Sequence, residues 1–169
     1  GGSEHLYPPE PFAPVYAAAR KLGLRTSAHA GEAAGPGSVR GAVEALQVDR
    51  IGHGIAARDD ADVLALLAER QTPIELCPLS NVATGSLARI EDHPVRQFWD
   101  AGLMLTVNTD DPGMFHNSMA DEFVVLHEVF GFSRDQIKTF VLNGINASWQ
   151  AADSKAAMAQ AFRDDPAWR

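Results

Sequence analysis

Three features are scarce or absent in this sequence of 169 residues. No apolar run approaches the ~20 residues that a membrane-spanning helix needs, so no membrane association is expected. The single cysteine, Cys77, excludes a disulfide within the chain and fits a reducing compartment, for which we expect the cytoplasm. Lysine and arginine form no basic stripe and the formal net charge is −8, so nucleic-acid binding is not expected. A small neutral or cationic ligand fits this composition better.

Strand-like and helix-like segments alternate along the chain. Apolar patterning predicts strands near residues 24–28, 50–53, 73–77 and 103–108. Helices are expected over residues 11–22, from a cap at Ser38, from Asp59 or Asp60, and over residues 93–101, 117–130, 133–142 and 147–152 and onward. Strands and helices that alternate in this way indicate parallel strands with crossover helices. We therefore expect one α/β domain over residues 1–169, with about four β/α units of a (β/α)8 barrel and extra C-terminal helices.

Polar residues stand at the carboxyl ends of three predicted strands: His29, His53 and Asp110. In a (β/α) barrel these ends share the face on which active sites are built. His29 alone would fit a buried core histidine equally well, but three such residues at strand ends indicate a site. Imidazole and carboxylate groups are usual zinc ligands. Asp110 and Asp111 are adjacent and repel each other, so a cation on Asp110 would relieve the pair and leave Asp111 to face a substrate.

Four motifs support a more specific interpretation. They are HAGE at residues 29–32, RIGHG at 50–54, ELCPLSN at 75–81 and NTDDPGMF at 108–115. In this order and spacing they resemble the adenosine deaminase family of the amidohydrolase superfamily, and the resemblance runs from residue 1 to about residue 149. The opening GGSE also resembles a segment of that family, which makes a linker origin for these glycines the weaker explanation.

The resemblance implies a role for each matched residue. His29 and Asp110 would be zinc ligands, Glu32 would protonate N1 of the purine, and His53 would take a proton from the attacking water. Asp111, in its protonated form, would hydrogen-bond N7, and the backbone of Gly2 would contact the purine. The implied reaction is zinc-dependent hydrolysis of adenosine or deoxyadenosine, which replaces the 6-amino group with an oxo group and releases ammonia.

One part of the family pattern is absent. The family carries an H-x-H pair that supplies two further zinc ligands, and no two of the six histidines here are spaced in that way. We therefore expect the C-terminal half of a deaminase, inactive by itself. Its strands are rich in Leu, Ile and Val, so we expect an uncovered apolar interior that pairs with the missing N-terminal half or with a second copy.

Two alternatives remain open. The substrate could be adenine or another 6-aminopurine derivative, and the chain could be a catalytically silent half-barrel. Structural positions without a catalytic role are expected for the other residues: Cys77 buried in the barrel, His93 at the start of a helix, His127 on a helix surface, and His5 and His116 in loops. His116 is also a weak candidate for substrate contact. Ser80 and Asn81 are candidates for hydrogen bonds that support the site.

Overall fold

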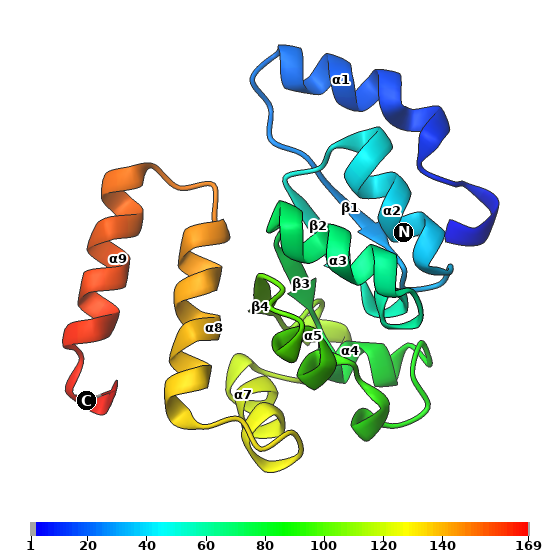
Figure 1. Ribbon diagram of the computed structural model, residues 1–169. Helices are drawn as coiled ribbons and strands as arrows, with labels where there is room; N and C mark the ends of the chain where they lie inside the picture. Colours follow the sequence, from blue (N-terminus) through cyan, green and yellow to red (C-terminus); the bar gives the residue numbers. More distant parts are fainter. Residues whose placement is uncertain (1–2, 169) are drawn as a thin grey trace.

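A parallel four-stranded sheet in the order β1-β2-β3-β4 forms the centre of the fold (Figure 1). The structure, a computed structural model, describes residues 3–168. The strands are β1 (Ser27–Ala30), β2 (Arg50–His53), β3 (Ile74–Leu76) and β4 (Leu105–Val107). The four predicted parallel strands and the α/β class are therefore confirmed.

Helices connect the strands and extend the chain beyond β4. Helix α1 (Ala13–Lys21) precedes β1, and the connections contain α2 (Pro36–Gly41), a π-helical turn (Ala42–Leu46), α3 (Ala61–Arg70), α4 (Pro78–Ala83) and α5 (Val95–Asp100). After β4 come α6 (Pro112–Phe115), α7 (Met119–Glu128), α8 (Arg134–Ala147) and α9 (Ala152–Asp164). Short 3-10 turns cover Glu4–Leu6, Glu10–Phe12, Ile55–Asp59, Ile90–Asp92 and Pro166–Trp168.

Side chains at the helix starts explain several of these boundaries. Asp60 caps α3, because its carboxylate accepts hydrogen bonds from the backbone N–H groups of Asp62 and Val63. Ser118 and Ser133 form capping boxes at the starts of α7 and α8. These caps place the helices close to where the sequence predicts them.

Some predicted boundaries are wrong. The first strand starts at Ser27 and not at residue 24, because pairing with β2 begins there, and the strand includes His29. Ser38 does not cap a helix: it lies inside α2, and its hydroxyl donates to the carboxylate of Glu4. Residues 147–152 are not one helix, because α8 ends at Ala147 and α9 begins at Ala152. The short helices α4 and α6 were not predicted; each starts at a proline, which suits the first helical position.

The two faces of the sheet differ in chemistry. The paired residues Ala28, Ile51, Ile74 and Leu105 form one cross-strand row, and the last three are 0% exposed. They belong to the core that the helices cover. The neighbouring row on the opposite face is His29, Gly52, Glu75 and Thr106. The expectation of an apolar, uncovered barrel interior is therefore wrong, because the Leu, Ile and Val side chains point to the helices.

Uncovered apolar side chains lie elsewhere, in the segment before β1. Figure 1 shows α1 on the β1 side of the sheet and the pair α8 and α9 on the β4 side. Large apolar side chains in the segment around α1 are 43–78% exposed: Leu6, Tyr7, Phe12, Val15, Leu22 and Leu24. Among the described helices, none is both long enough and apolar enough to cross a bilayer.

Candidate active site

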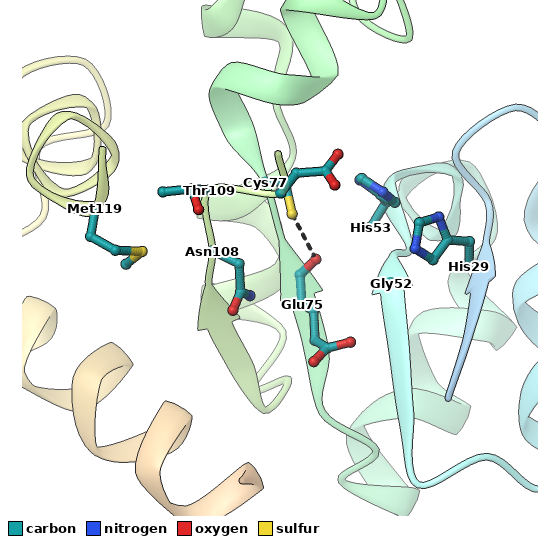
Figure 2. Close-up of a pocket in the computed structure, with 9 residues that line it drawn as sticks. His29, Gly52, His53, Glu75, Cys77, Asn108, Thr109 and Met119 are labelled. Carbon is teal, nitrogen blue, oxygen red and sulfur yellow. Dashed lines mark hydrogen bonds between the residues drawn. The ribbon is translucent and has the colours of Figure 1, made fainter. Parts of the chain in front are cut away.

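Three side chains converge where β1 and β2 end. His29 lies in β1, His53 is the last residue of β2, and Glu32 follows β1 in the chain. The Oε2 atom of Glu32 lies 3.4 Å from Nε2 of His53 and 3.8 Å from Nδ1 of His29. The two imidazole rings meet edge to face with centroids 4.8 Å apart, and Figure 2 shows them side by side at the mouth of the pocket. The structure thus brings together three of the residues that the sequence singles out.

The backbone at this end of the sheet is unusual. His53 has φ +64° and Asp110 has φ +60°, in the left-handed region that non-glycine residues seldom occupy. His53 is the last residue of β2, and Asp110 follows shortly after β4. The chain therefore turns sharply where these two polar side chains emerge. Such conformations cluster at functional sites, because the surrounding structure must hold them in place.

Asp110 lies in the same pocket but outside the cluster of three. It lines the pocket together with both histidines, and its Oδ2 accepts a hydrogen bond from the hydroxyl of Ser80 at 2.6 Å. Asp111 has a different position: its Oδ1 accepts from the backbone N–H of Met114 at 3.0 Å, which caps α6, and it is not among the residues that line this pocket. Gly2 lies outside the described residues, so its contact with a substrate stays a prediction.

His53 is a buried imidazole held from both sides. Its side chain is 2% exposed, and Nδ1 lies 3.1 Å from the side-chain amide nitrogen of Asn81, so Nε2 faces Glu32. Burial lowers the pKa of His53 below its ordinary value of 6.5; nearby Glu32, Asp110 and Glu4 oppose this and His29 adds to it. The neutral ring is therefore favoured.

The backbone that carries Glu32 is anchored by Glu4. This buried carboxylate accepts hydrogen bonds from the N–H groups of Gly31, Glu32 and Ala33, and from the hydroxyl of Ser38. Burial raises the pKa of Glu4, but the four hydrogen bonds outweigh that effect and lower it below the ordinary value of 4.5. Glu4 thus fixes the loop after β1 in one position.

The pocket itself is open, with a volume of about 320 Å³. This is within the range of small-molecule sites. Glu75, from the polar row of the sheet, also lines it; Figure 2 shows its carboxylate directed away from the two histidines, and it is paired with Arg50 at 3.3 Å. Cys77, Asn108, Thr109 and Met119 complete the lining. Burial raises the pKa of the Cys77 thiol, which is 5% exposed, so the prediction that it is a buried barrel residue is confirmed.

The donor set suits a zinc ion. The ligand atoms offered by His29, Glu32 and His53 all lie within 4.8 Å of one another. Atoms bound at about 2 Å to one tetrahedral ion are roughly 3.3 Å apart, close to the two Glu32 contacts given above. Two imidazoles and carboxylates, with Asp110 in the same pocket, are the ligand types that zinc takes in catalytic sites.

The other histidines lie outside the cluster. His93 accepts a hydrogen bond at Nδ1 from the N–H of Val95, the first residue of α5, which confirms its predicted place at a helix start. His127 is exposed on α7, as predicted, and its Nδ1 lies 2.9 Å from the carbonyl oxygen of Phe132. His116 ends α6 with φ +53°, and His5 lies in the turn before α1. Neither lines the pocket that contains the histidine pair.

The sequence does not single out Glu4 or Glu75 as residues of the site region. The signal for Glu4 was its position within GGSE, a motif that was noted for its glycine. Glu75 interrupts an otherwise apolar strand, which is a signal for a polar inward face. The supporting hydrogen bonds expected of Ser80 and Asn81 are confirmed.

Comparisons with known proteins give the same family along most of the chain. The Adenosine deaminase family model matches residues 1–164. Among curated relatives, an aminodeoxyfutalosine deaminase of Streptomyces avermitilis is 37% identical over 94% of this chain and 44% of its own length. An adenine deaminase of Rhodopseudomonas palustris is 38% identical over 97% of this chain and 48% of its own length. An adenosine deaminase of Escherichia coli is 38% identical over 93% of this chain and 47% of its own length. The chain thus spans about half the length of these relatives.

Solved structures extend the likeness to three dimensions. An adenine deaminase from Arthrobacter aurescens superimposes with a TM-score of 0.88 at 36% identity, over 93% of this chain and 48% of the other. An amidohydrolase from Burkholderia ambifaria with bound Zn superimposes with a TM-score of 0.84 at 34% identity, over 95% of this chain and 45% of the other. The four β/α units described above therefore correspond to about half of a barrel of the amidohydrolase type.

Proposed function

The chain belongs to the adenosine deaminase family, and from this membership we propose that its site serves the zinc-dependent hydrolytic deamination of adenosine or deoxyadenosine. The observation that carries the proposal is the convergence of His29, Glu32 and His53 at the end of the sheet, next to a pocket that both histidines and Asp110 line. The products would be inosine or deoxyinosine and ammonia.

We propose His29 and Asp110 as metal ligands, with the remaining protein ligands outside the residues that carry this pocket. Glu32 and His53 lie close enough to His29 to share an ion with it, but the proposed reaction needs both of them for proton transfer. The chemistry expected of a zinc ion there is to lower the pKa of a water molecule to about 7, which makes hydroxide available near neutral pH. A zinc-bound solved structure at 34% identity supports zinc over other metals.

The proton transfers fall to Glu32 and His53. Glu32 delivers a proton to N1 of the purine, which makes C6 more electrophilic, while the neutral imidazole of His53 takes a proton from the attacking water. The 3.4 Å separation of Glu32 Oε2 and His53 Nε2 supports this proposal, because two groups so close together can act on the same substrate. The proton held by His53 then leaves with the amino group as ammonia, the proton of the added hydroxyl returns to Glu32, and the 6-oxo purine with a proton on N1 remains.

Asp111 is proposed to bind N7 of the purine through its second carboxylate oxygen, since Oδ1 is held by Met114. A hydrogen bond to N7 needs a proton on Asp111. The backbone of Gly2 is proposed to contact the purine.

A second candidate substrate is free adenine. The adenine deaminase of Rhodopseudomonas palustris matches 97% of this chain, and the one from Arthrobacter aurescens shares its fold at a TM-score of 0.88. The chemistry at C6 would be unchanged, and only the groups that accept or reject a ribose would differ.

Ammonia release from adenosine, deoxyadenosine and adenine, measured with and without added zinc, tests the proposal. Glu32→Gln removes the acid at the centre and should lower kcat at least about 100-fold. Glu69→Gln, on the exposed side of α3, is the matched control and should leave the rate unchanged. Because the 169-residue chain is expected to be inactive by itself, the assay uses it together with an N-terminal half that carries the H-x-H pair. Zinc binding by that assembly without release of ammonia from any of the three substrates would refute the proposed reaction, and absence of zinc binding would favour a catalytically silent domain.

A further inference from the structure

Helix α7 contributes a carboxylate to the interior that the proposed reaction does not use. The side chain of Glu122 is 0% exposed. One oxygen accepts a hydrogen bond from the backbone N–H of Leu79 at 3.3 Å, and the other accepts from the side-chain amide of Asn117 at 2.8 Å. A buried carboxylate is costly unless donors compensate it, so this position is held for its hydrogen bonds and not for packing alone.

Both partners of Glu122 lead to the candidate site. Leu79 lies in the first turn of α4, next to Ser80, whose hydroxyl donates to Asp110. Asn117 also donates to the carbonyl oxygen of Thr109, the residue before Asp110, at 3.1 Å. The result is a closed ring of contacts that runs from Glu122 through α4 to Asp110 and returns through the loop after β4.

The ring joins segments that are far apart in the sequence. Glu122 is 43 residues from Leu79, and Ser80 is 30 residues from Asp110. Asp110 has an uncommon φ of +60°, so its backbone depends on such neighbours to keep its conformation. Burial raises the pKa of Glu122 to about 7, while the hydrogen bonds from Leu79 and Asn117 act against that rise.

We propose that Glu122 is a positioning residue for the site: it holds the start of α4 against the loop after β4 and so keeps Ser80 hydrogen-bonded to Asp110. The inference rests on the proposed function only where it takes Asp110 as a zinc ligand. Groups that orient a ligating carboxylate typically change metal affinity by about 10–100-fold when they are removed.

The test is the zinc affinity of the whole chain, measured by competition with a chromophoric chelator. Glu122→Gln keeps the size of the side chain but turns an amide N–H toward Leu79 or Asn117, which breaks one arm of the ring. We expect zinc affinity to fall by about tenfold or more. Glu128→Gln, the same substitution on the exposed face of α7, should leave it within twofold of the wild type.

A double-mutant cycle separates positioning from a general loss of structure. Ser80→Ala should weaken zinc binding about as much as Glu122→Gln, and the double variant should be little worse than either single variant, because both changes break the same ring. Unchanged zinc affinity in Glu122→Gln, or effects that add fully in the double variant, would overturn the proposal.

A metal-free measurement distinguishes this inference from the proposed function. If the wild-type chain binds no zinc, the proposed metal chemistry fails, but crystal structures of the wild type and Glu122→Gln still decide the inference. The hydrogen bond between Ser80 and Asp110 should be lost in the variant, and amide exchange at Leu79 should be faster. An intact Ser80–Asp110 contact and unchanged exchange in the variant would show that Glu122 does not position Asp110.

Discussion

A Cβ atom on Gly52 would lie 2.7 Å from Cδ2 of His29. The two residues are paired across β1 and β2, so the imidazole lies against the one position in β2 that has no side chain. Gly52 thereby leaves the space that lets His29 turn toward Glu32 and His53.

Replacement of Gly52 by alanine should therefore displace the His29 ring. We expect the free energy of unfolding to drop by about 1–3 kcal/mol, as for other overpacked sites, and zinc affinity to fall as well. Gly37→Ala is the control, because a Cβ there meets nothing within 4 Å. Urea denaturation and chelator competition provide the two measurements. A fully stable Gly52→Ala variant with wild-type zinc affinity would contradict the role given to this contact.

Glu4 should be essential for the loop that carries Glu32. In Glu4→Gln the side-chain amide would face N–H donors, so at least one of the backbone groups of Gly31, Glu32 and Ala33 loses its acceptor. Leaving such a group unsatisfied costs about 1–3 kcal/mol. We therefore expect the free energy of unfolding, measured with urea, to fall by this amount. We also expect a lower kcat for ammonia release. Glu10→Gln, an exposed change in the same segment, should have neither effect.

The pH dependence of stability should carry a contribution from His93. Its ring is 3% exposed, and burial lowers its pKa to about 3, with Arg58 and His53 adding to the shift. Between pH 6.5 and 3 the unfolded chain binds a proton that the folded chain does not. The contribution of neutral His93 to the free energy of unfolding is therefore complete above pH 6.5 and is lost as the pH falls. The loss is about 2 kcal/mol between pH 6.5 and 5.

The measurement compares His93→Asn with the wild type in urea at several pH values. Asparagine offers an oxygen to the N–H of Val95 but does not titrate, so the variant should lose less stability on acidification. The quantity to compare is the difference in unfolding free energy between the two proteins at each pH. Burial raises the pKa of Glu122 to about 7, so Glu122 makes both folded proteins more stable as the pH falls, and this effect cancels in the difference. Parallel curves for the two proteins would show that His93 does not titrate as described.

The exposed apolar segment around α1 should make the 169-residue chain associate with itself. Val15 is 65% exposed and Leu22 is 78% exposed, and four further large apolar side chains lie near them. Contiguous apolar surface of this kind is uncommon on monomers. Light scattering should give a mass above 18.2 kDa, and the double variant Val15→Glu, Leu22→Glu should approach that monomer mass. Met158→Glu, on α9, is the control. A monodisperse wild-type monomer would contradict this expectation.

The sequence by itself determined the fold class and the residues at the strand ends. Alternation of apolar strands with capped helices requires parallel pairing, and parallel pairing brings the carboxyl ends of the strands to one edge. For this reason the sequence alone predicts that His29, His53 and Asp110 share one face, and local capping sets helix starts such as Asp60 and Ser133.

Only the tertiary structure decided how these residues are held. The carboxylate of Glu4 reaches the loop after β1 across 27 residues, and Glu122 reaches Leu79 across 43, and no local pattern reveals such partners. The same holds for the polar inner row of Glu75 and Thr106, since a strand's period shows that its two faces differ but not which one the helices cover. Local chemistry fixes where a strand or helix begins, whereas the orientation of a catalytic side chain depends on hydrogen bonds between segments that meet only in the folded chain.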